Sequence, residues 1–175
     1  MLKLNDQKIE EIHQVVVGLG SNIDPSENLK SSIYLLGRLV PIVAISGVWL
    51  TRAVGSPGPD FLNAAALITT PLSADELRSN ILRPIENLLG RIRAKDPNAP
   101  RTIDLDILIY DDKLLDDELW NYAHMAVPVA EILPAYVDPD SGEKATTIAE
   151  RLQESGHISR YPLKLHLTSP TRDIV

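Results

Sequence analysis

The chain has 175 residues, a length typical of one domain, because a single hydrophobic core usually takes about 100–200 residues. Apolar residues make up 44% of it and charged residues 23%, which excludes an intrinsically disordered chain or a coiled coil. The absence of cysteine excludes a disulfide framework, a thiolate nucleophile and a cysteine-based zinc site. With 17 basic and 24 acidic residues the formal net charge is −7, the wrong sign for a protein that binds nucleic acid over its whole surface.

No run of apolar residues approaches the roughly 18 that a membrane-spanning helix requires. Residues 1–13 carry charges where a signal peptide would have its apolar stretch. We therefore predict a cytoplasmic protein with no membrane partner. Its oligomeric state leaves no signal in the sequence.

The first part of the chain predicts a strand, a helix and two further strands. Residues 14–19 are rich in β-branched valine and lead into a Gly-Ser-Asn turn, which is typical of a strand that enters a loop. Residues 25–39 begin with proline and carry apolar residues at helical spacing. Residues 42–51 and 61–70 have strand patterns, and the turn-rich loop between them is too short for a crossover helix. We expect these two strands to be antiparallel neighbours.

The next elements complete a recognisable order. Residues 73–90 predict a second helix that ends at a glycine, and residues 103–110 predict a fourth strand. The order β-α-β-β-α-β predicts an α+β fold, a ferredoxin-like antiparallel sheet with both helices packed on one face. C-terminal additions follow it, including a short helix near residues 145–153.

The predicted domain organisation is simple. We expect one domain over residues 14–155, an N-terminal extension over 1–13 and a C-terminal tail over 156–175. The tail, from about Ser155, has no strong pattern and is predicted to be poorly ordered.

The strongest chemical signal is the segment PRTIDLDIL, residues 100–108. On a strand, Asp104 and Asp106 leave the same face with Cα atoms about 6.6–7 Å apart, while Ile103, Leu105 and Ile107 point into the core. Two like charges on one strand repel each other unless cations lie between them. Oxygen ligands without histidine or cysteine favour Mg²⁺ over zinc. The alternative is the solvated polar face of an edge strand, which is the commoner meaning of an isolated Asp-x-Asp.

A basic segment precedes the two aspartates. Residues 83–101 hold five basic and two acidic side chains, and residues 104–118 hold seven acidic side chains and one lysine. Arg101, Arg91 and Arg93 approach the aspartate strand from the same side, and guanidinium groups can bind phosphate oxygens. Each arginine taken singly is more often a surface residue, but their convergence on a carboxylate pair favours a phosphate site.

The remaining candidates are weaker. Phe61 and Asn63 share one face of a predicted strand, so a ring and an amide could together bind a flat heteroaromatic molecule, although a phenylalanine in this position is more often a core residue. His124 lies among apolar residues and taken alone suits a structural role. The chain has no P-loop pattern.

Five segments together resemble the 6-hydroxymethyl-7,8-dihydropterin pyrophosphokinase family of folate biosynthesis. They are VGLGSNI (17–23), FLNAA (61–65), LLGRIR (88–93), PRTIDLDIL (100–108) and PVAEILP (128–134). The resemblance runs from Val15 to Pro139. It implies a ferredoxin-like α+β fold and transfer of the β,γ-pyrophosphate of ATP to the hydroxymethyl group of the pterin, with release of AMP.

The resemblance also implies a role for each matching residue. Asp104 and Asp106 match the two aspartates that hold two Mg²⁺ ions, and Arg101 and Arg91 match catalytic arginines. The nucleotide-side positions are Glu86, Arg93, Arg101, Ile107 and His124. The pterin-side positions are Thr51, Val54, Phe61 and Asn63.

The chain departs from the family pattern in two places. The loop 93–101, a predicted lid, lacks the tryptophan that the family carries before Gly-Pro-Arg, and the segment around His124 is shortened and lacks the family's arginine and phenylalanine. Trp120 or Tyr122 could supply a ring from another direction. Two alternatives therefore stay open: an enzyme of the same fold acting on a different pteridine or hydroxymethyl heterocycle, and a non-catalytic nucleotide-binding regulator.

Overall fold

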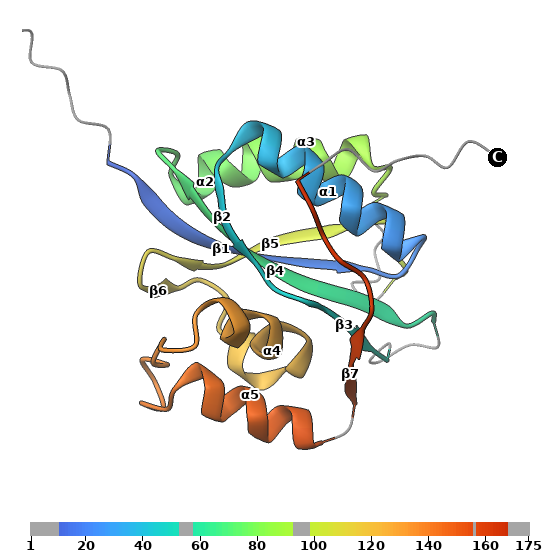
Figure 1. Ribbon diagram of the computed structural model, residues 1–175. Coiled ribbons are helices and arrows are strands. Elements are labelled where there is room, and N and C mark those ends of the chain that lie inside the picture. The colour runs from blue at the N-terminus through green and yellow to red at the C-terminus, as the bar shows by residue number, and fades with distance from the viewer. Residues whose placement is uncertain (1–10, 53–57, 93–98, 156, 168–175) are drawn as a thin grey trace, which may run out of the picture.

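The computed structural model describes residues 11–52, 58–92, 99–155 and 157–167 (Figure 1). The strands are β1 (His13–Ser21), β2 (Ile42–Ile45), β3 (Val48–Thr51), β4 (Phe61–Thr70), β5 (Asp104–Tyr110), β6 (Lys113–Leu114) and β7 (Ile158–Tyr161). The α-helices are α1 (Pro25–Leu39), α2 (Ala74–Leu77), α3 (Arg83–Leu88), α4 (Ala123–Ile132) and α5 (Ala145–Glu154). A π-helical segment, η1 (Arg78–Leu82), joins α2 to α3, and a 3₁₀ turn, η2 (Leu119–Asn121), precedes α4.

The strands form one sheet in the order β6-β5-β1-β4-β3-β7, with β2 also paired to β4. Each of the six strand pairings is antiparallel. The longest pairing joins β1 to β4 and runs from His13 opposite Thr70 to Ser21 opposite Leu62. The prediction of helices with an antiparallel sheet is thereby confirmed.

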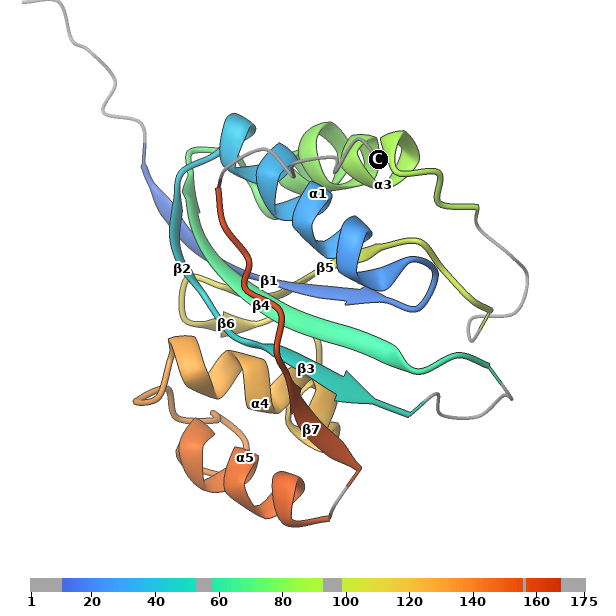
Figure 2. The ribbon, with the colours of Figure 1, turned by 45° about the vertical axis from the view of Figure 1, so that its right-hand side comes forward.

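Helices cover both faces of the sheet. In two views α1, α2 and α3 lie on one face, and α4 and α5 lie on the other (Figures 1 and 2). In β1 the residues Val15, Val17 and Leu19 belong to the core beneath α1, whereas Val16 belongs to the core beneath α4. None of the helices in the described ranges has the length and apolar character that crossing a membrane demands.

The strand predicted over residues 42–51 is two strands, β2 and β3. The backbone N–H of Ser46 donates to the Ala65 carbonyl at 2.9 Å, and the Ser46 hydroxyl accepts from the Ala65 N–H at 2.8 Å. One serine thus satisfies both backbone groups of its partner on β4, and the chain then continues into β3. A hydroxyl that replaces a backbone group in this way leaves no signature in the alternation of the sequence.

The helix predicted over residues 73–90 begins with a capping box and contains a π-helical turn. The Ser73 hydroxyl accepts from the Glu76 N–H, and the Glu76 carboxylate accepts from the Ser73 N–H. Further along, the Arg83 N–H donates to the carbonyl of Arg78, five residues back. The next residue, Pro84, has no N–H to donate, so the wider turn lies where the α-helical ladder is already interrupted.

The C-terminal segment contributes a strand, contrary to our prediction of a poorly ordered tail. β7 pairs with β3 from Val48 opposite Tyr161 to Thr51 opposite Ile158. Arg160 lies over the Trp49 ring at 5.1 Å and forms an ion pair with Glu131 of α4. Four residues with two exposed polar side chains give too short a pattern to predict a strand, and it is the pairing with β3 that places them.

The packing of α1 predicts how two leucines of the same helix differ. Leu36 is fully buried, whereas Leu39 is 55% exposed. We expect Leu36→Ala to lower the free energy of unfolding by about 2–5 kcal/mol, because it removes buried methyl groups and leaves a cavity. Leu39→Ala should change it by less than about 0.5 kcal/mol. Urea unfolding followed by circular dichroism measures both, and equal losses would contradict this packing.

Candidate active site

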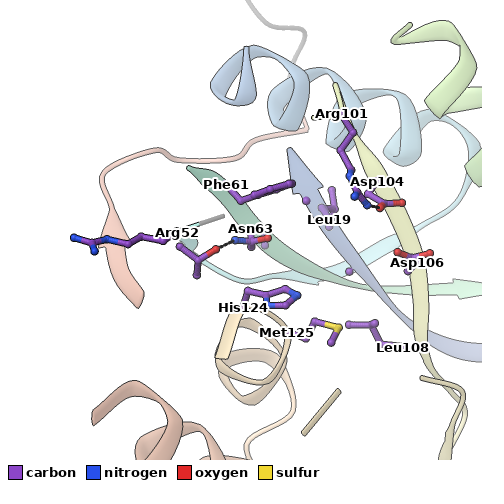
Figure 3. Close-up of a pocket in the computed structure, with 14 residues that line it drawn as sticks. Leu19, Arg52, Phe61, Asn63, Arg101, Asp104, Asp106, Leu108, His124 and Met125 are labelled. Carbon is purple, nitrogen blue, oxygen red and sulfur yellow. Dashed lines mark hydrogen bonds and ion pairs between the residues drawn. The ribbon is translucent and has the colours of Figure 1, made fainter. Parts of the chain in front are cut away.

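A cavity of about 240 Å³ opens between the sheet and the start of α4 (Figure 3). Strands β1, β3, β4 and β5 and the first turn of α4 contribute its walls. Its lining residues are Gly18, Leu19, Gly20, Thr51, Arg52, Phe61, Asn63, Ala64, Arg101, Asp104, Asp106, Leu108, His124 and Met125. Seven of the predicted site residues are among them, from segments more than 70 positions apart.

Two glycines of β1 form the floor of the cavity. Gly18 pairs with Asp106 and Gly20 pairs with Asp104, so each carboxylate stands beside a residue without a side chain. A Cβ at Gly18 would lie 2.9 Å from Cδ1 of Leu108, which is closer than Cβ atoms normally approach other atoms. The glycines therefore leave room for two other residues that line the cavity, Leu108 beside Gly18 and Asn63 beside Gly20.

The two aspartates lie as the strand period predicts. Both line the cavity, while Leu105 and Ile107 between and beyond them are buried in the core on the opposite face. Ile107, which the family resemblance placed on the nucleotide side, is 3% exposed, and its side chain does not reach the cavity. That part of the expectation is wrong for the side chain, because a residue one position from Asp106 points to the other face of the sheet.

The carboxylate of Asp104 is held by two arginines. Arg91 donates from Nη1 to Oδ1 of Asp104 and also to Oε1 of Glu86, and Arg101 donates from Nη1 to Oδ2 of Asp104. Glu86 is 2% exposed, and its Oε1 also accepts the Leu105 N–H at 3.0 Å. Glu86 thus fixes both Arg91 and the start of β5. Burial lowers the pKa of Arg91, but the two adjacent carboxylates outweigh it and raise that pKa, so the guanidinium stays charged.

The carboxylate of Asp106 has a different environment. It makes no hydrogen bond to another residue of the described ranges, and it faces the cavity. Removal from water and the neighbouring charge of Asp104 raise its pKa to about 6, against the opposing effect of Arg91. Near neutral pH the ionised Asp106 therefore carries an electrostatic cost that a bound cation would remove.

The donor set suits Mg²⁺ that arrives with phosphate. Within the described residues no three histidine or acidic side chains are grouped to hold a metal by themselves. Mg²⁺ commonly uses one or two carboxylates and takes its remaining ligands from water and substrate phosphates. Asp104 and Asp106 would supply that pair of carboxylates.

The other end of the cavity carries the side-chain amide and the aromatic ring that the sequence predicted there. Asn63 is 4% exposed, and its Nδ2 donates to the Thr51 hydroxyl at 2.8 Å. Phe61 lines the cavity, and the guanidinium carbon of Arg101 lies 5.8 Å from the centre of its ring. Arg52 also reaches this rim, although nothing in its sequence context indicated it.

The first turn of α4 forms the wall of the cavity that lies across from β1. His124 and Met125 both line it (Figure 3). Burial lowers the pKa of His124, so the imidazole is neutral near pH 7. The Tyr122 ring lies 5.6 Å from that of His124. Trp120, by contrast, is buried in the core and stacks on Tyr136 at 5.8 Å, so the suggestion that it supplies a ring to the site is wrong.

Two predicted site residues, Val54 and Arg93, lie outside the described residues, as does most of the predicted lid. No sequence pattern indicated five further lining residues, which tertiary packing brings to the cavity: Leu19, Arg52, Ala64, Leu108 and Met125. Gly18 and Gly20 had a usable signal. Both alternate with Val17 and Leu19, which places them on the face opposite the core.

The residues that build this site lie within a region that matches a known protein family. Residues 16–134 match the 7,8-dihydro-6-hydroxymethylpterin-pyrophosphokinase (HPPK) family. The chain belongs to this family. A relative from Synechocystis sp., named 2-amino-4-hydroxy-6-hydroxymethyldihydropteridine pyrophosphokinase, is 35% identical over 154 residues, which cover 82% of this chain and 78% of the relative. A relative of the same name from Pseudomonas putida is 37% identical and covers 62% of this chain and 91% of its own length.

Solved structures share the fold. A triple mutant of Plasmodium falciparum HPPK-DHPS with pteroate superposes with a TM-score of 0.67 at 10% sequence identity over 88% of this chain. An HPPK-DHPS protein in complex with substrates also gives a TM-score of 0.67, at 11% identity over 85% of this chain. This chain spans about half the length of those two, 47% and 46%.

The raised pKa of Asp106 predicts a stability change that depends on pH and on metal. Its pKa is 3.8 in an ordinary environment and about 6 in the folded protein. Ionisation therefore destabilises the metal-free fold at about pH 7, and this cost disappears as the pH falls below about 4. We expect Asp106→Asn to raise the melting temperature of the metal-free protein at about pH 7 and to have no such effect at about pH 4.

Thermal melts with and without chelator measure this difference. Asp112→Asn, which removes an exposed acidic group next to the same strand, serves as the control and should leave the melting temperature unchanged. An Asp106→Asn variant less stable than the parent at neutral pH would show that the carboxylate is satisfied within the fold.

Proposed function

We propose that this protein transfers the pyrophosphoryl group of ATP to the hydroxymethyl group of 6-hydroxymethyl-7,8-dihydropterin, giving AMP and the pterin diphosphate for folate biosynthesis. One observation carries the proposal. A single cavity has two carboxylates flanked by arginines at one end and a buried amide beside a ring at the other, in a chain that belongs to the family with this activity. The two ends differ in chemistry as a triphosphate and a flat heterocycle do.

The heterocycle end has the groups to hold a pterin in one orientation. Asn63 and Thr51 offer hydrogen-bonding groups to the polar edge of the ring system, and Phe61 offers a face for stacking. A ring bound between them directs its substituent toward Asp104 and Asp106, the next groups along the same sheet face. The attacking hydroxyl would then lie on the side of the carboxylates.

The phosphate end has the groups to hold a triphosphate. Asp104 and Asp106 would hold Mg²⁺, of which we propose two ions, and bound Mg²⁺ would supply neutralisation of phosphate charge and orientation of the reacting phosphorus. Arg91 and Arg101 bind the Asp104 carboxylate in the metal-free protein. Both guanidinium groups would bind phosphate oxygens of the nucleotide and stabilise the charge that grows on the leaving AMP.

The remaining expectations complete the proposal. We propose that His124 contacts the nucleotide and that Glu86 acts near it by holding Arg91. We also propose that Arg93 and Val54 act at positions the family resemblance implies and that the catalytic unit is one cytoplasmic domain. The strand order β5-β1-β4-β3 with helices α1 and α3 on one face supports a ferredoxin-like topology for its central part.

A second substrate class is favoured by one feature of the cavity. Phe61 is the one phenyl ring among its lining residues, and Met125 and Leu108 contribute aliphatic side chains to its wall. A wall of flexible aliphatic side chains accepts more shapes than a ring does. The alternative is therefore pyrophosphoryl transfer to a different pteridine.

The product identifies the reaction. Incubation with ATP, Mg²⁺ and the reduced pterin alcohol should yield AMP and pterin diphosphate in equal amounts, as measured by ion-exchange chromatography and mass spectrometry. ADP as the product would refute pyrophosphoryl transfer. Binding of ATP with no cleavage in the presence of any pterin would support a regulator instead.

Two substitutions should separate the ends of the cavity. Asp106→Ala should abolish AMP formation, because it removes one of the two carboxylates at the phosphate end. Asn63→Ala should raise KM for the pterin by about tenfold or more through loss of hydrogen bonds to the ring edge, with a smaller effect on KM for ATP. Steady-state kinetics measure both, and equally small effects would count against these roles.

A further inference from the structure

The two ends of the cavity are joined by one buried side chain that does not line it. Asn22 follows β1 and is 5% exposed. Its Oδ1 accepts the backbone N–H of Arg101 at 2.7 Å, and its Nδ2 donates to the backbone carbonyl of Pro59 at 3.2 Å. Arg101 belongs to the phosphate end, and Pro59 lies two residues before Phe61 of the heterocycle end.

The chemistry of these partners fixes the orientation of the amide. A backbone N–H can only donate and a backbone carbonyl can only accept, so Oδ1 must face Arg101 and Nδ2 must face Pro59. The backbone of the same turn adds to the link on one side, because the N–H groups of Asn22 and Ile23 donate to the Arg101 carbonyl at 3.1 and 3.2 Å. On the other side, the Asn22 amide carries the hydrogen bond to Pro59.

A second contact runs between the same two segments inside the cavity. The Arg101 guanidinium lies over the Phe61 ring, so a shift of one segment relative to the other changes both that contact and the position of Arg101 against Asp104. Ligands at both ends therefore depend on the distance that Asn22 sets.

We propose that Asn22 is a positioning residue that couples the two substrate sites: it holds the Arg101 segment and the Pro59–Phe61 segment in one register. This inference rests on the proposed function. A nucleotide bound at Arg101 fixes that segment, and the amide transmits the constraint to the segment that carries Phe61. By reciprocity, a bound pterin raises the affinity for the nucleotide by the same factor.

Asn22→Asp tests the link with the least change in shape. The carboxylate can still accept the Arg101 N–H, but it has no proton to donate to the Pro59 carbonyl. Asn28→Asp is the matched control, because Asn28, in the first turn of α1, donates from Nδ2 to the Ile23 carbonyl at 2.7 Å, and its side chain has no hydrogen bond to either segment among the described residues. It introduces the same charge and removes one hydrogen bond of the same kind.

The measurement is a ratio of affinities. Pterin fluorescence gives the Kd of 6-hydroxymethylpterin in the absence and in the presence of saturating α,β-methylene ATP with Mg²⁺. We expect the analogue to lower the Kd of the pterin by the same factor in the parent protein and in Asn28→Asp. In Asn22→Asp this factor should be about tenfold smaller, as expected for one lost hydrogen bond. Its affinity for the analogue alone should change by less than about threefold.

Each other outcome overturns the inference. Three of them concern the ratio of the pterin Kd values without and with the analogue: an unchanged ratio in Asn22→Asp, an equal fall of the ratio in Asn28→Asp, and no enhancement in the parent protein. The fourth is weaker binding of each ligand alone with the ratio unchanged, which is the result of a merely structural role. Should Asn22→Asp not fold, Asn22→Ser replaces it, since one short hydroxyl cannot bridge both segments. Failure of the proposed function is distinguishable, because the parent protein would then form no AMP and pterin diphosphate from ATP and the reduced pterin alcohol.

Discussion

Two like charges on one face of a single strand are the constraint around which the site is arranged. Asp104 and Asp106 stand on β5 opposite two glycines of β1, and the fold neutralises them unequally. Asp104 receives two arginines, whereas burial and the charge of Asp104 raise the pKa of Asp106 to about 6. The protein thus keeps an electrostatic cost beside its cavity, which a bound cation would reduce.

The two faces of the sheet divide the tasks of stability and function. The face beneath α1 and α3 is a continuous apolar core, into which β1, β4 and β5 each send alternate residues. The other face is apolar only at the end that α4 and α5 cover, and at its open end it carries the carboxylates, Asn63 and the glycines. Because the core face fixes the register of every strand, a slip by one residue would exchange the aspartates with buried leucine and isoleucine. Stability and the site therefore depend on the same alternation.

Whatever depended on local periodicity could be predicted from the sequence. The aspartate pair, the strands around it, the two central helices and the helix at 145–154 follow from patterns within about 15 residues. The failures involve partners distant in the chain: Ser46 replaces a backbone group of β4, β7 exists because β3 offers it an edge, and Trp120 is buried by Tyr136. Asn22 had a turn signal, but its two partners lie 37 and 79 positions away, so nothing nearby indicated its role.

The two ends of the cavity are built from different kinds of interaction. The phosphate end is built from short segments in which Arg91 and Arg101 both pair with Asp104, so replacement of Asp104 removes an ion-pair partner from two guanidinium groups. The heterocycle end is built from β3, β4 and α4, each of which contributes one or two side chains by van der Waals contact and single hydrogen bonds. Loss of a ring there costs contact area and leaves no buried charge. Substrate shape can therefore vary at that end while the phosphate chemistry is retained, with the backbone links at Asn22 keeping the two ends in register.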